Sequence, residues 1–165
     1  DFPSALEKRI SLLNITKQNI KDTIQTLQNH LSNSFQNNIK KFNMKNCFII
    51  SGGFKEIILP IMIPYGFKEK NIYANSFLFD DNKNAVIDRN NDLFKEGGKC
   101  LASKKIQGFK IIIGDGYTDY ELKKYKNANI FILFTENVHR KNLTQYADYI
   151  AKDFKEVYKI IQNVK

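Results

Sequence analysis

The residues Gly114-Asp115-Gly116-Tyr117-Thr118-Asp119 follow the apolar run Phe109-Lys110-Ile111-Ile112-Ile113 and precede a helical pattern. This order predicts a buried strand that delivers the carboxylates of Asp115 and Asp119 into a glycine-rich turn. The glycines allow a tight or positive-φ backbone and the close approach of an anion. Carboxylates at the end of a strand suit a hard cation such as Mg²⁺, which prefers oxygen ligands. The stretch therefore indicates a phosphate-metal corner, although Asp-Gly also marks ordinary turns.

Outward from this corner, apolar runs alternate with helical patterns. Strands are expected at 47–50, 71–74, 76–79, 85–87, 109–113, 130–134 and 149–150, and the strands at 76–79 and 85–87 form a hairpin about a polar turn. Helices are expected after residue 53, at 98–106, at 117–126, between 134 and 149, and at 154–161. Apolar strands that alternate with helices predict an α/β fold, a Rossmann-like parallel sheet covered on both faces.

The first part of the chain, residues 1–43, has no strand-like alternation and is expected to be a small helical region. Leucine and isoleucine recur at helical spacing after Pro3-Ser4, which is a suitable helix start. Thr16 is expected to cap a second helix and Ser34 a third, short one. Residues 44–165 then form the α/β core.

Composition narrows the classes of partner. The 165 residues suit one domain or a core with a small insertion, and 13 phenylalanines and many isoleucines supply that core. The net charge of +9 comes from scattered lysines, so no nucleic-acid partner is expected, although a positive field attracts a phosphorylated metabolite. The apolar stretch 57–65 contains Pro60 and Pro64 and is too short to span a bilayer, so no membrane partner is expected.

Cysteine and histidine show no metal-binding or disulfide pattern. Cys47 and Cys100 have neither the spacing of a metal site nor that of a disulfide framework, so reduced thiols and a cytoplasmic location are expected. His30 and His139 have no Cys/His cluster around them and are expected at the surface.

Three chemically suggestive groups stand where strands end, which is where ligands bind in open parallel sheets. Ser51-Gly52-Gly53 offers a hydroxyl and backbone amides before a helix. Lys99 follows Glu96-Gly97-Gly98 and opens another helix, where an ammonium can neutralise phosphoryl charge. Alone, each group fits a plain turn, a surface lysine or a helix cap. In this order, and with Asp115 and Asp119, they indicate one phosphate site.

This ordered set resembles the motifs of the haloacid-dehalogenase-like (HAD-like) phosphatases. Ser51-Gly52-Gly53 resembles the second motif of that family, Lys99 the third, and the stretch 114–119 the fourth. Residues 1–13 and 48–54 are similar to the start of the helical cap and to the second-motif strand of the phosphoserine phosphatases. The resemblance implies a HAD-like α/β core at 44–165 with a small α-helical cap at 1–43.

The resemblance also implies a reaction, the Mg²⁺-dependent hydrolysis of O-phospho-L-serine to L-serine and phosphate through an aspartyl-phosphate. Asp115 matches the metal ligand of the family, and Asp119 supports the metal site and orients Lys99. Lys99 stabilises the nucleophile and the developing charge. Such an activity belongs to L-serine biosynthesis.

Substrate contacts are implied by the same motifs. Ser51 hydrogen-bonds a phosphoryl oxygen, with the Gly52 and Gly53 amides nearby. Arg9 matches the cap arginine that grips the substrate carboxylate, which suits a planar guanidinium, but an exposed arginine paired with Glu7 or Glu56 is an equal alternative. Thr118 stands where many relatives carry asparagine, so it retains a hydroxyl and lacks the amide.

One motif is missing. The first motif of the family, Asp-x-Asp-x-Thr/Val, carries the nucleophile, and Pro3 stands where its second aspartate would follow Asp1. We therefore expect a fragment of a longer enzyme that lacks the nucleophile and the first, mid-sheet strand. Such a chain would be inactive alone, and it would be completed by another segment, would self-associate or would be marginally stable. The alternatives are a phosphatase for another small phosphomonoester and a non-catalytic HAD-like regulatory or binding module.

Overall fold

The structure is a computed structural model that describes residues 2–164 and divides them into two compact units. The first unit contains the described residues up to Leu31 together with Asn43–Gly98, and the second unit contains Ser32–Phe42 and the described residues from Lys99 onward. Each unit has a parallel sheet and helices of its own. The predicted mixed α/β fold class is confirmed, with the parallel strands shared between two small sheets.

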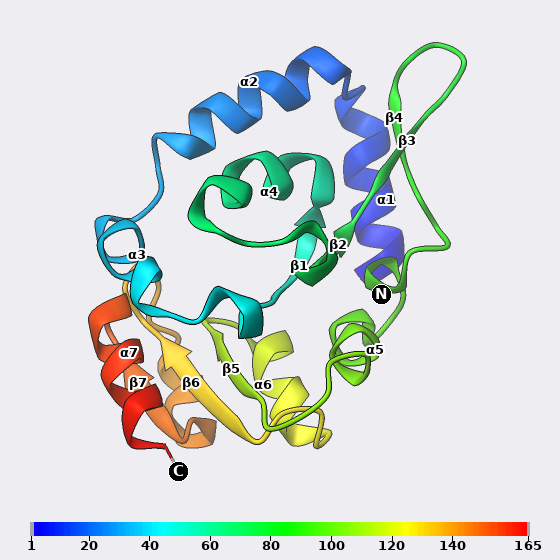
Figure 1. The fold of residues 1–165 in the computed structure, drawn as a ribbon. Helices are drawn as coiled ribbons and strands as arrows, with labels where there is room; N and C mark the ends of the chain where they lie inside the picture. The colour runs from blue at the N-terminus through cyan, green and yellow to red at the C-terminus, as the bar shows by residue number, and fades with distance from the viewer. Residues whose placement is uncertain (1, 165) are drawn as a thin grey trace. The chain divides into compact units, whose positions relative to one another are not determined.

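Two helices open the first unit (Figure 1), α1 (Phe2–Leu13) and α2 (Lys17–Gln28). Thr16 caps α2 as predicted, because its Oγ1 accepts a hydrogen bond from the Asn19 amide at 3.2 Å. The Thr16 amide in turn donates to Asn19 Oδ1 at 2.9 Å, so two backbone amides that the helix leaves unpaired are satisfied. The Ile20 side chain is buried against the rest of this unit.

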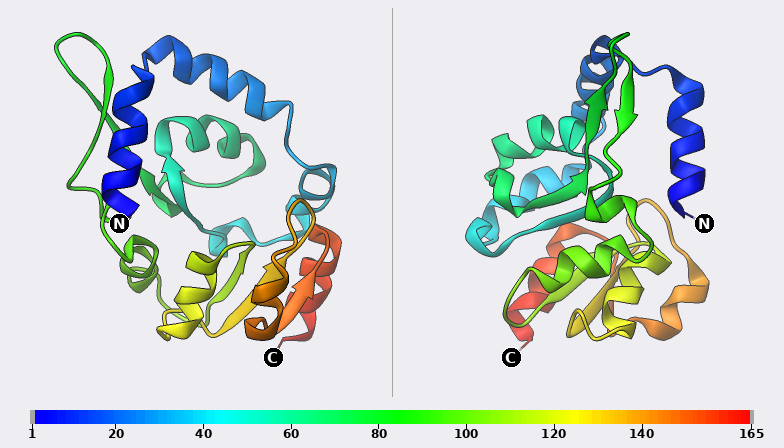
Figure 2. Two further views of the ribbon diagram at one scale, coloured as in Figure 1. Left: turned by 180° about the vertical axis from the view of Figure 1, so that it is seen from behind. Right: turned by 90° about the vertical axis from the view of Figure 1, so that its right-hand side faces the viewer.

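The remainder of the first unit forms a parallel strand pair, a hairpin and one helix of eight residues. Its elements are β1 (Ile49–Phe54), α4 (Lys55–Met62), β2 (Ile72–Asn75), β3 (Phe77–Phe79) and β4 (Ala85–Ile87), with short 3₁₀ turns at Met44–Asn46, Ile63–Tyr65, Glu69–Asn71 and Asp92–Phe94. β1 pairs in parallel with β2, and β3 pairs with β4 as the predicted hairpin, visible as adjacent green arrows in Figure 2. The rings of Phe54 and Phe77 stack at 3.8 Å inside a core that also holds Ile10, Ile20 and Ile87.

The second unit has a three-stranded sheet in which every pairing is parallel. Its elements are α3 (Asn33–Asn38), a 3₁₀ turn at Ile39–Lys41, α5 (Gly98–Lys104), β5 (Ile111–Gly114), α6 (Tyr117–Lys124), β6 (Ile130–Phe134), the 3₁₀ helix η6 (Lys141–Tyr146), β7 (Tyr149–Ala151) and α7 (Phe154–Asn163). The strand order is β5-β6-β7. The predicted strand at 130–134 coincides with β6.

Side chains alternate across β6, so the sheet of the second unit has two apolar faces. Phe131 and Leu133 are buried with Leu143 and Tyr120, on the face covered by α6 and η6. Ile132 is buried with side chains of α7, on the opposite face. A parallel strand that is covered on both faces must be apolar throughout, which explains the uninterrupted run Ile130–Phe134.

Residues 32–42 contact the C-terminal helix. Ser34 Oγ accepts a hydrogen bond from the Phe154 amide at 3.1 Å, and the rings of Phe35 and Phe154 meet edge to face at 5.1 Å, with α3 beside α7 in Figure 1. These contacts assign α3 to the second unit. The described part of residues 1–43 is otherwise helical or irregular, apart from an isolated bridge at Thr16, and the predicted cap boundary at residue 43 stays a prediction.

Three local predictions were wrong. The third helix is capped by Ser32, whose Oγ accepts from the Phe35 amide, and not by Ser34, whose hydroxyl donates to Glu136. The expected strand at 109–113 begins at Ile111 because pairing with β6 begins there. The helix expected between 134 and 149 is the 3₁₀ helix η6, preceded by Arg140.

Candidate functional site

The predicted catalytic lysine and the second aspartate of the corner form an ion pair. Lys99, in the first turn of α5, donates to Asp119 Oδ1 at 2.6 Å. Both side chains are largely shielded from water, with 23% of Lys99 and 13% of Asp119 exposed. An ammonium and a carboxylate 20 residues apart in sequence are thus held together at the carboxyl end of β5. Water screening of their charges is correspondingly weak.

Asp119 is also fixed by the turn that precedes it. Its Oδ2 accepts a hydrogen bond from the Gly116 amide at 3.1 Å, at the start of α6. A Cβ atom added to Gly114 would lie 2.3 Å from the Asp119 carboxyl carbon, whereas one added to Gly116 would have Oδ2 as its nearest Asp119 atom, at 3.4 Å. Gly114 is therefore required by the packing of the carboxylate. Gly114, the last residue of β5, is thus the glycine of this stretch whose small size the site needs.

The first aspartate of the corner is held by an arginine that the sequence analysis did not single out. Arg140 lies just before η6 and donates from Nε to the main-chain oxygen of Asp115 at 3.1 Å and from Nη2 to Asp115 Oδ2 at 3.2 Å. About half of each side chain is exposed. The sequence offered one signal for Arg140, its place in the segment that follows β6. Because β6 pairs with β5 in parallel, the carboxyl ends of both strands lie at the same edge of the sheet.

The residues around Asp115 fit a metal ion that takes most of its ligands from water and substrate phosphate, and not an ion held by protein side chains alone. Within residues 2–164, no group of three or more His, Cys, Asp or Glu side chains lies close enough to hold a metal ion. Asp115 offers a half-exposed carboxylate, and Mg²⁺ commonly uses one or two carboxylates together with waters and substrate phosphate. The residues present fit Mg²⁺ on those terms.

The Ser51-Gly52-Gly53 motif lies inside a strand, which corrects one prediction. The strand was expected to end at residue 50, but β1 continues through the motif to Phe54, and α4 begins at Lys55. The register between β1 and β2 shifts between Ile50 and Phe54, so the motif occupies an irregular part of the strand. Small residues tolerate such an irregularity because they carry little or no side chain to pack.

Polar contacts around this motif are local. The Gly53 amide donates to Ser51 Oγ at 3.0 Å, which leaves the hydroxyl hydrogen of Ser51 available to another acceptor. Asn75, at the end of β2 and fully buried, donates to the Gly52 carbonyl oxygen at 2.9 Å. The sequence analysis missed Asn75, and no pattern in the sequence distinguishes it from the other asparagines.

Two of the predicted substrate contacts, Arg9 and Thr118, are exposed. In the described part of the chain Arg9 pairs with neither Glu7 nor Glu56, since Glu7 binds Arg89 and Glu56 Oε1 accepts from the Phe77 amide. The alternative in which Arg9 serves only in an ion pair is not seen. Among residues 2–164 no ion pair of Arg9 is found, so its exposed guanidinium is available to a ligand carboxylate.

The structure therefore brings together part of the predicted site. Lys99, Asp115, Thr118 and Asp119 all lie in the second unit, and the residues of the other half, Arg9 and Ser51-Gly52-Gly53, lie in the first. The convergence of the two halves stays a prediction. Each half is described by its own contacts.

Neither cysteine is activated. Both are free thiols, as expected, and burial raises the pKa of Cys47 above its ordinary value. Burial also raises the pKa of Cys100, against a smaller opposing effect of a hydrogen bond with Asn127. A raised pKa lowers the fraction of thiolate at neutral pH, so neither residue is suited to nucleophilic chemistry. His30 and His139 are exposed, as predicted.

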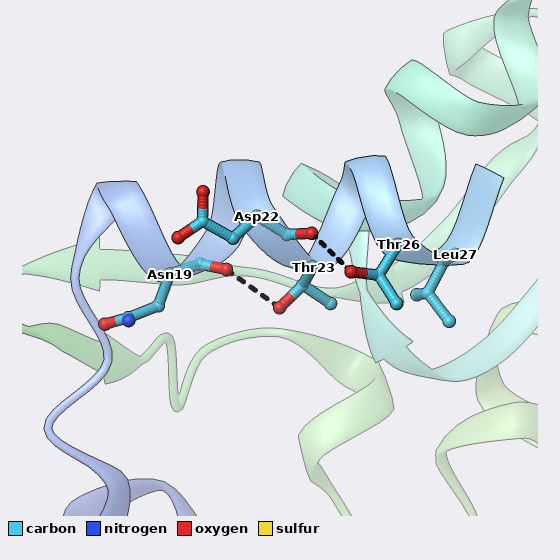
Figure 3. A pocket seen from close by; sticks show the side chains of 5 residues that line it. All are labelled: Asn19, Asp22, Thr23, Thr26 and Leu27. Carbon is cyan, nitrogen blue, oxygen red and sulfur yellow. Dashed lines mark hydrogen bonds between the residues drawn. The ribbon is translucent and has the colours of Figure 1, made fainter. Parts of the chain in front are cut away.

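A hollow on α2 carries no comparable chemistry. Figure 3 shows its lining, which consists of Asn19, Asp22, Thr23, Thr26 and Leu27. The hydroxyls of Thr23 and Thr26 donate to main-chain oxygens one turn earlier, at 2.8 and 2.9 Å, so their hydrogens are used within the helix.

Within residues 2–164, no helix combines the length and apolar character needed to cross a bilayer.

Known proteins similar to this chain point to one family. No family profile matches it. The chain is 34% identical to phosphoserine phosphatase of Drosophila melanogaster. The match covers 94% of this chain and 60% of the Drosophila protein. It is 30% identical to phosphoserine phosphatase of Homo sapiens, again over 94% of its length, and covers 72% of that protein. It thus spans less than two thirds of the Drosophila relative.

A solved structure shows the same fold. The crystal structure of a phosphoserine phosphohydrolase-like protein from Francisella tularensis matches with a TM-score of 0.85 and 28% identity, over 97% of this chain and 77% of that one. Sequence identity, fold and the geometry at the end of β5 agree. This chain belongs to the phosphoserine phosphatase-like family of the HAD-like hydrolases.

Proposed function

We propose that this chain supplies the phosphate- and metal-binding part of a Mg²⁺-dependent phosphoserine phosphatase. The observation that carries the proposal is the Lys99–Asp119 ion pair of 2.6 Å beside Asp115, at the end of a parallel strand in a chain of this family. The substrate is O-phospho-L-serine and the products are L-serine and phosphate. A place in L-serine biosynthesis belongs to the same proposal, and so does a cytoplasmic location, which the two free thiols support.

Each residue has a role that its chemistry supports. Lys99 neutralises charge on the phosphoryl group while Asp119 holds the ammonium in place. Ser51 donates its hydroxyl hydrogen to a phosphoryl oxygen, and the amides of Gly52 and Gly53 lie in the same strand segment. Bound at Asp115, Mg²⁺ would supply positive charge to the phosphate and order its oxygens.

Recognition of the serine part is assigned to Arg9 and Thr118. Arg9 is exposed and unpaired among the described residues, and a guanidinium binds a carboxylate through two parallel hydrogen bonds. Thr118 is exposed at the start of α6 and contributes a hydroxyl that can donate or accept. In this proposal Lys99 and Ser51 bind the phosphate, and Arg9 and Thr118 bind the amino-acid part of the substrate.

Phosphate release from phosphoserine tests the proposal. The assay compares the 165-residue chain with the full reading frame that contains it, with and without Mg²⁺, and includes Lys99→Ala and Asp115→Asn in the longer protein. We expect Mg²⁺-dependent turnover by the longer protein, a loss of at least 100-fold in each variant, and negligible turnover by the 165-residue chain. Undiminished turnover in both variants would exclude the assigned roles.

A substrate panel separates phosphoserine from other small phosphomonoesters. Phosphoserine should be preferred, and Arg9→Ala should raise KM for phosphoserine more than KM for a phosphomonoester without a carboxylate. A non-catalytic module is the second candidate, because the sequence contains no Asp-x-Asp-x-Thr/Val motif. Phosphoserine binding by the longer protein without any phosphate release would favour it.

We further propose that the parallel sheets are completed by an added strand. Among the described residues, β5 pairs with β6 alone and β1 with β2 alone, so one edge of each strand is unpaired. Parallel strands are normally interior to a sheet, and an open apolar edge such as Ile111–Ile113 invites another strand. An extended segment supplied by the longer protein is the proposed partner, and a second copy of the chain is the alternative.

Light scattering and hydrogen exchange test this completion. The isolated chain should self-associate as its concentration rises, or its β5 amides should exchange far faster than those of β6. In the longer protein both sets of amides should be protected. A stable monomer of the isolated chain with fully protected β5 amides would contradict the proposal.

A further inference from the structure

Arg140 donates two hydrogen bonds to Asp115. Its Nε binds the main-chain oxygen of Asp115 and its Nη2 binds the Oδ2 atom of the carboxylate, at 3.1 and 3.2 Å. These two donors belong to one planar group, so the guanidinium is oriented as well as placed. The contact joins the loop after β6 to the end of β5 within the second unit.

The two ion pairs of the corner differ in exposure. Lys99 and Asp119 are largely shielded, whereas about half of Arg140 and half of Asp115 face solvent. Exposed ion pairs contribute little to stability, because water screens the charges and both side chains lose freedom. The Arg140–Asp115 contact is therefore easily broken, and the carboxylate can be released without disturbing the Lys99–Asp119 pair.

We propose that Arg140 competes with a divalent cation for the carboxylate of Asp115. This inference rests on the proposed function, in which Asp115 binds Mg²⁺. A cation bound at Oδ2 would displace the Nη2 donor, because the two positive charges repel each other at the same oxygen, so the Nη2 contact would open when the cation binds there. The Nε contact to the main-chain oxygen can persist and keep the arginine beside the site. Arg140 is thus a positioning residue that occupies Asp115 in the absence of metal.

Metal binding to the 165-residue chain tests this inference without reference to turnover. Mn²⁺ is titrated into the chain while free Mn²⁺ is followed by electron paramagnetic resonance. Arg140→Gln removes the competing charge and should lower the Kd for Mn²⁺ by about two- to fivefold, as expected for loss of an exposed ion pair. Lys141→Gln is the matched control, because it removes the same charge from the neighbouring exposed residue and should leave Kd unchanged.

The outcomes separate the inference from the proposed function. An Arg140→Gln affinity that is unchanged or weaker overturns the competition, even if Asp115→Asn abolishes Mn²⁺ binding and so supports the metal site. Binding that survives Asp115→Asn, or no binding by the parent chain, overturns both. Equal gains in Arg140→Gln and Lys141→Gln would reduce the effect to net charge and overturn the competition.

A second measurement follows the arginine itself. The Nε–H signal of Arg140 in a ¹H–¹⁵N spectrum, identified by its loss in Arg140→Gln, should shift as Mg²⁺ is added. The shift should be absent in Asp115→Asn. A signal that does not respond to Mg²⁺ in the parent chain would contradict a guanidinium that opens when the cation binds.

Discussion

The two glycine-containing strand segments of this chain are built in different ways. At the end of β5, Asp119 is fixed by Lys99 and by the Gly116 amide, and Asp115 by Arg140, so the contacts reach three separate parts of the second unit. In β1, Ser51 contacts the amide two residues later, and only Asn75 reaches in from β2. Charges that must be held in place need partners from several elements, whereas backbone amides and a hydroxyl need only a well-shaped strand.

The largest expected effect separates the glycines of the two segments. In Gly114→Ala the new Cβ would lie 2.3 Å from the Asp119 carboxyl group and displace it, so the free energy of unfolding should fall by about 1–3 kcal/mol. In Gly53→Ala the nearest atom, Ser51 Oγ, would be 3.3 Å away, and the loss should be smaller. Urea unfolding measures both.

Gly116→Ala is the control for Gly114→Ala, since its Cβ would lie no closer than 3.4 Å to Asp119. Both replacements add one methyl group within the same turn. Equal losses in the two variants would mean that packing against Asp119 is not the reason for Gly114.

The next effect concerns the shielded ion pair. Lys99→Met retains the apolar stem and leaves Asp119 without its ammonium, so the free energy of unfolding should fall by about 1–2 kcal/mol, between the values for exposed and buried pairs. The double variant with Asp119→Asn should be less destabilised than the sum of the single ones. Additive losses would show that the pair is not coupled.

A smaller effect is expected in β1. Asn75→Ala removes the donor to the Gly52 oxygen and should cost about 1 kcal/mol. The loss is limited because Asn75 Oδ1 has no hydrogen-bond partner in the described residues, so its removal relieves an unpaired buried oxygen. Thermal unfolding measures the change, and a loss as large as that of Lys99→Met would remove the contrast between the two segments.

The smallest effect is chemical. Burial raises the pKa of both cysteines, so each carries less thiolate than a free cysteine at any given pH. Iodoacetamide should therefore modify Cys47 and Cys100 more slowly than a cysteine peptide at pH 7, with the rates rising until the pH passes the raised pKa. Mass spectrometry at several pH values measures this. Faster labelling than the peptide at pH 7 would contradict it.

Sequence reasoning reached most of the secondary structure and, among the contacts of the site, the pairing of Lys99 with Asp119. The apolar strand at 130–134 and the Thr16 cap depend on neighbouring residues and were found where predicted. The cap at Ser32 was missed because two serines stand at the start of this helix, and the hydroxyls of both donate to Glu136 Oε2. Ser34 lies inside α3, which begins at Asn33, and its contact with Phe154 in α7 is one that a local pattern does not contain.

The sequence by itself determined the α/β class, the family and the identity of the ion-pairing residues Lys99 and Asp119. The class follows from apolar strand runs that alternate with helical patterns, and the family and the pairing follow from the resemblance of the ordered motifs to those of the HAD-like phosphatases. Only the tertiary structure decided that Ser51-Gly52-Gly53 stays within β1, that Arg140 binds Asp115, and that Gly114 makes room for Asp119. These depend on strand register and on contacts between residues far apart in sequence, and only packing sets them.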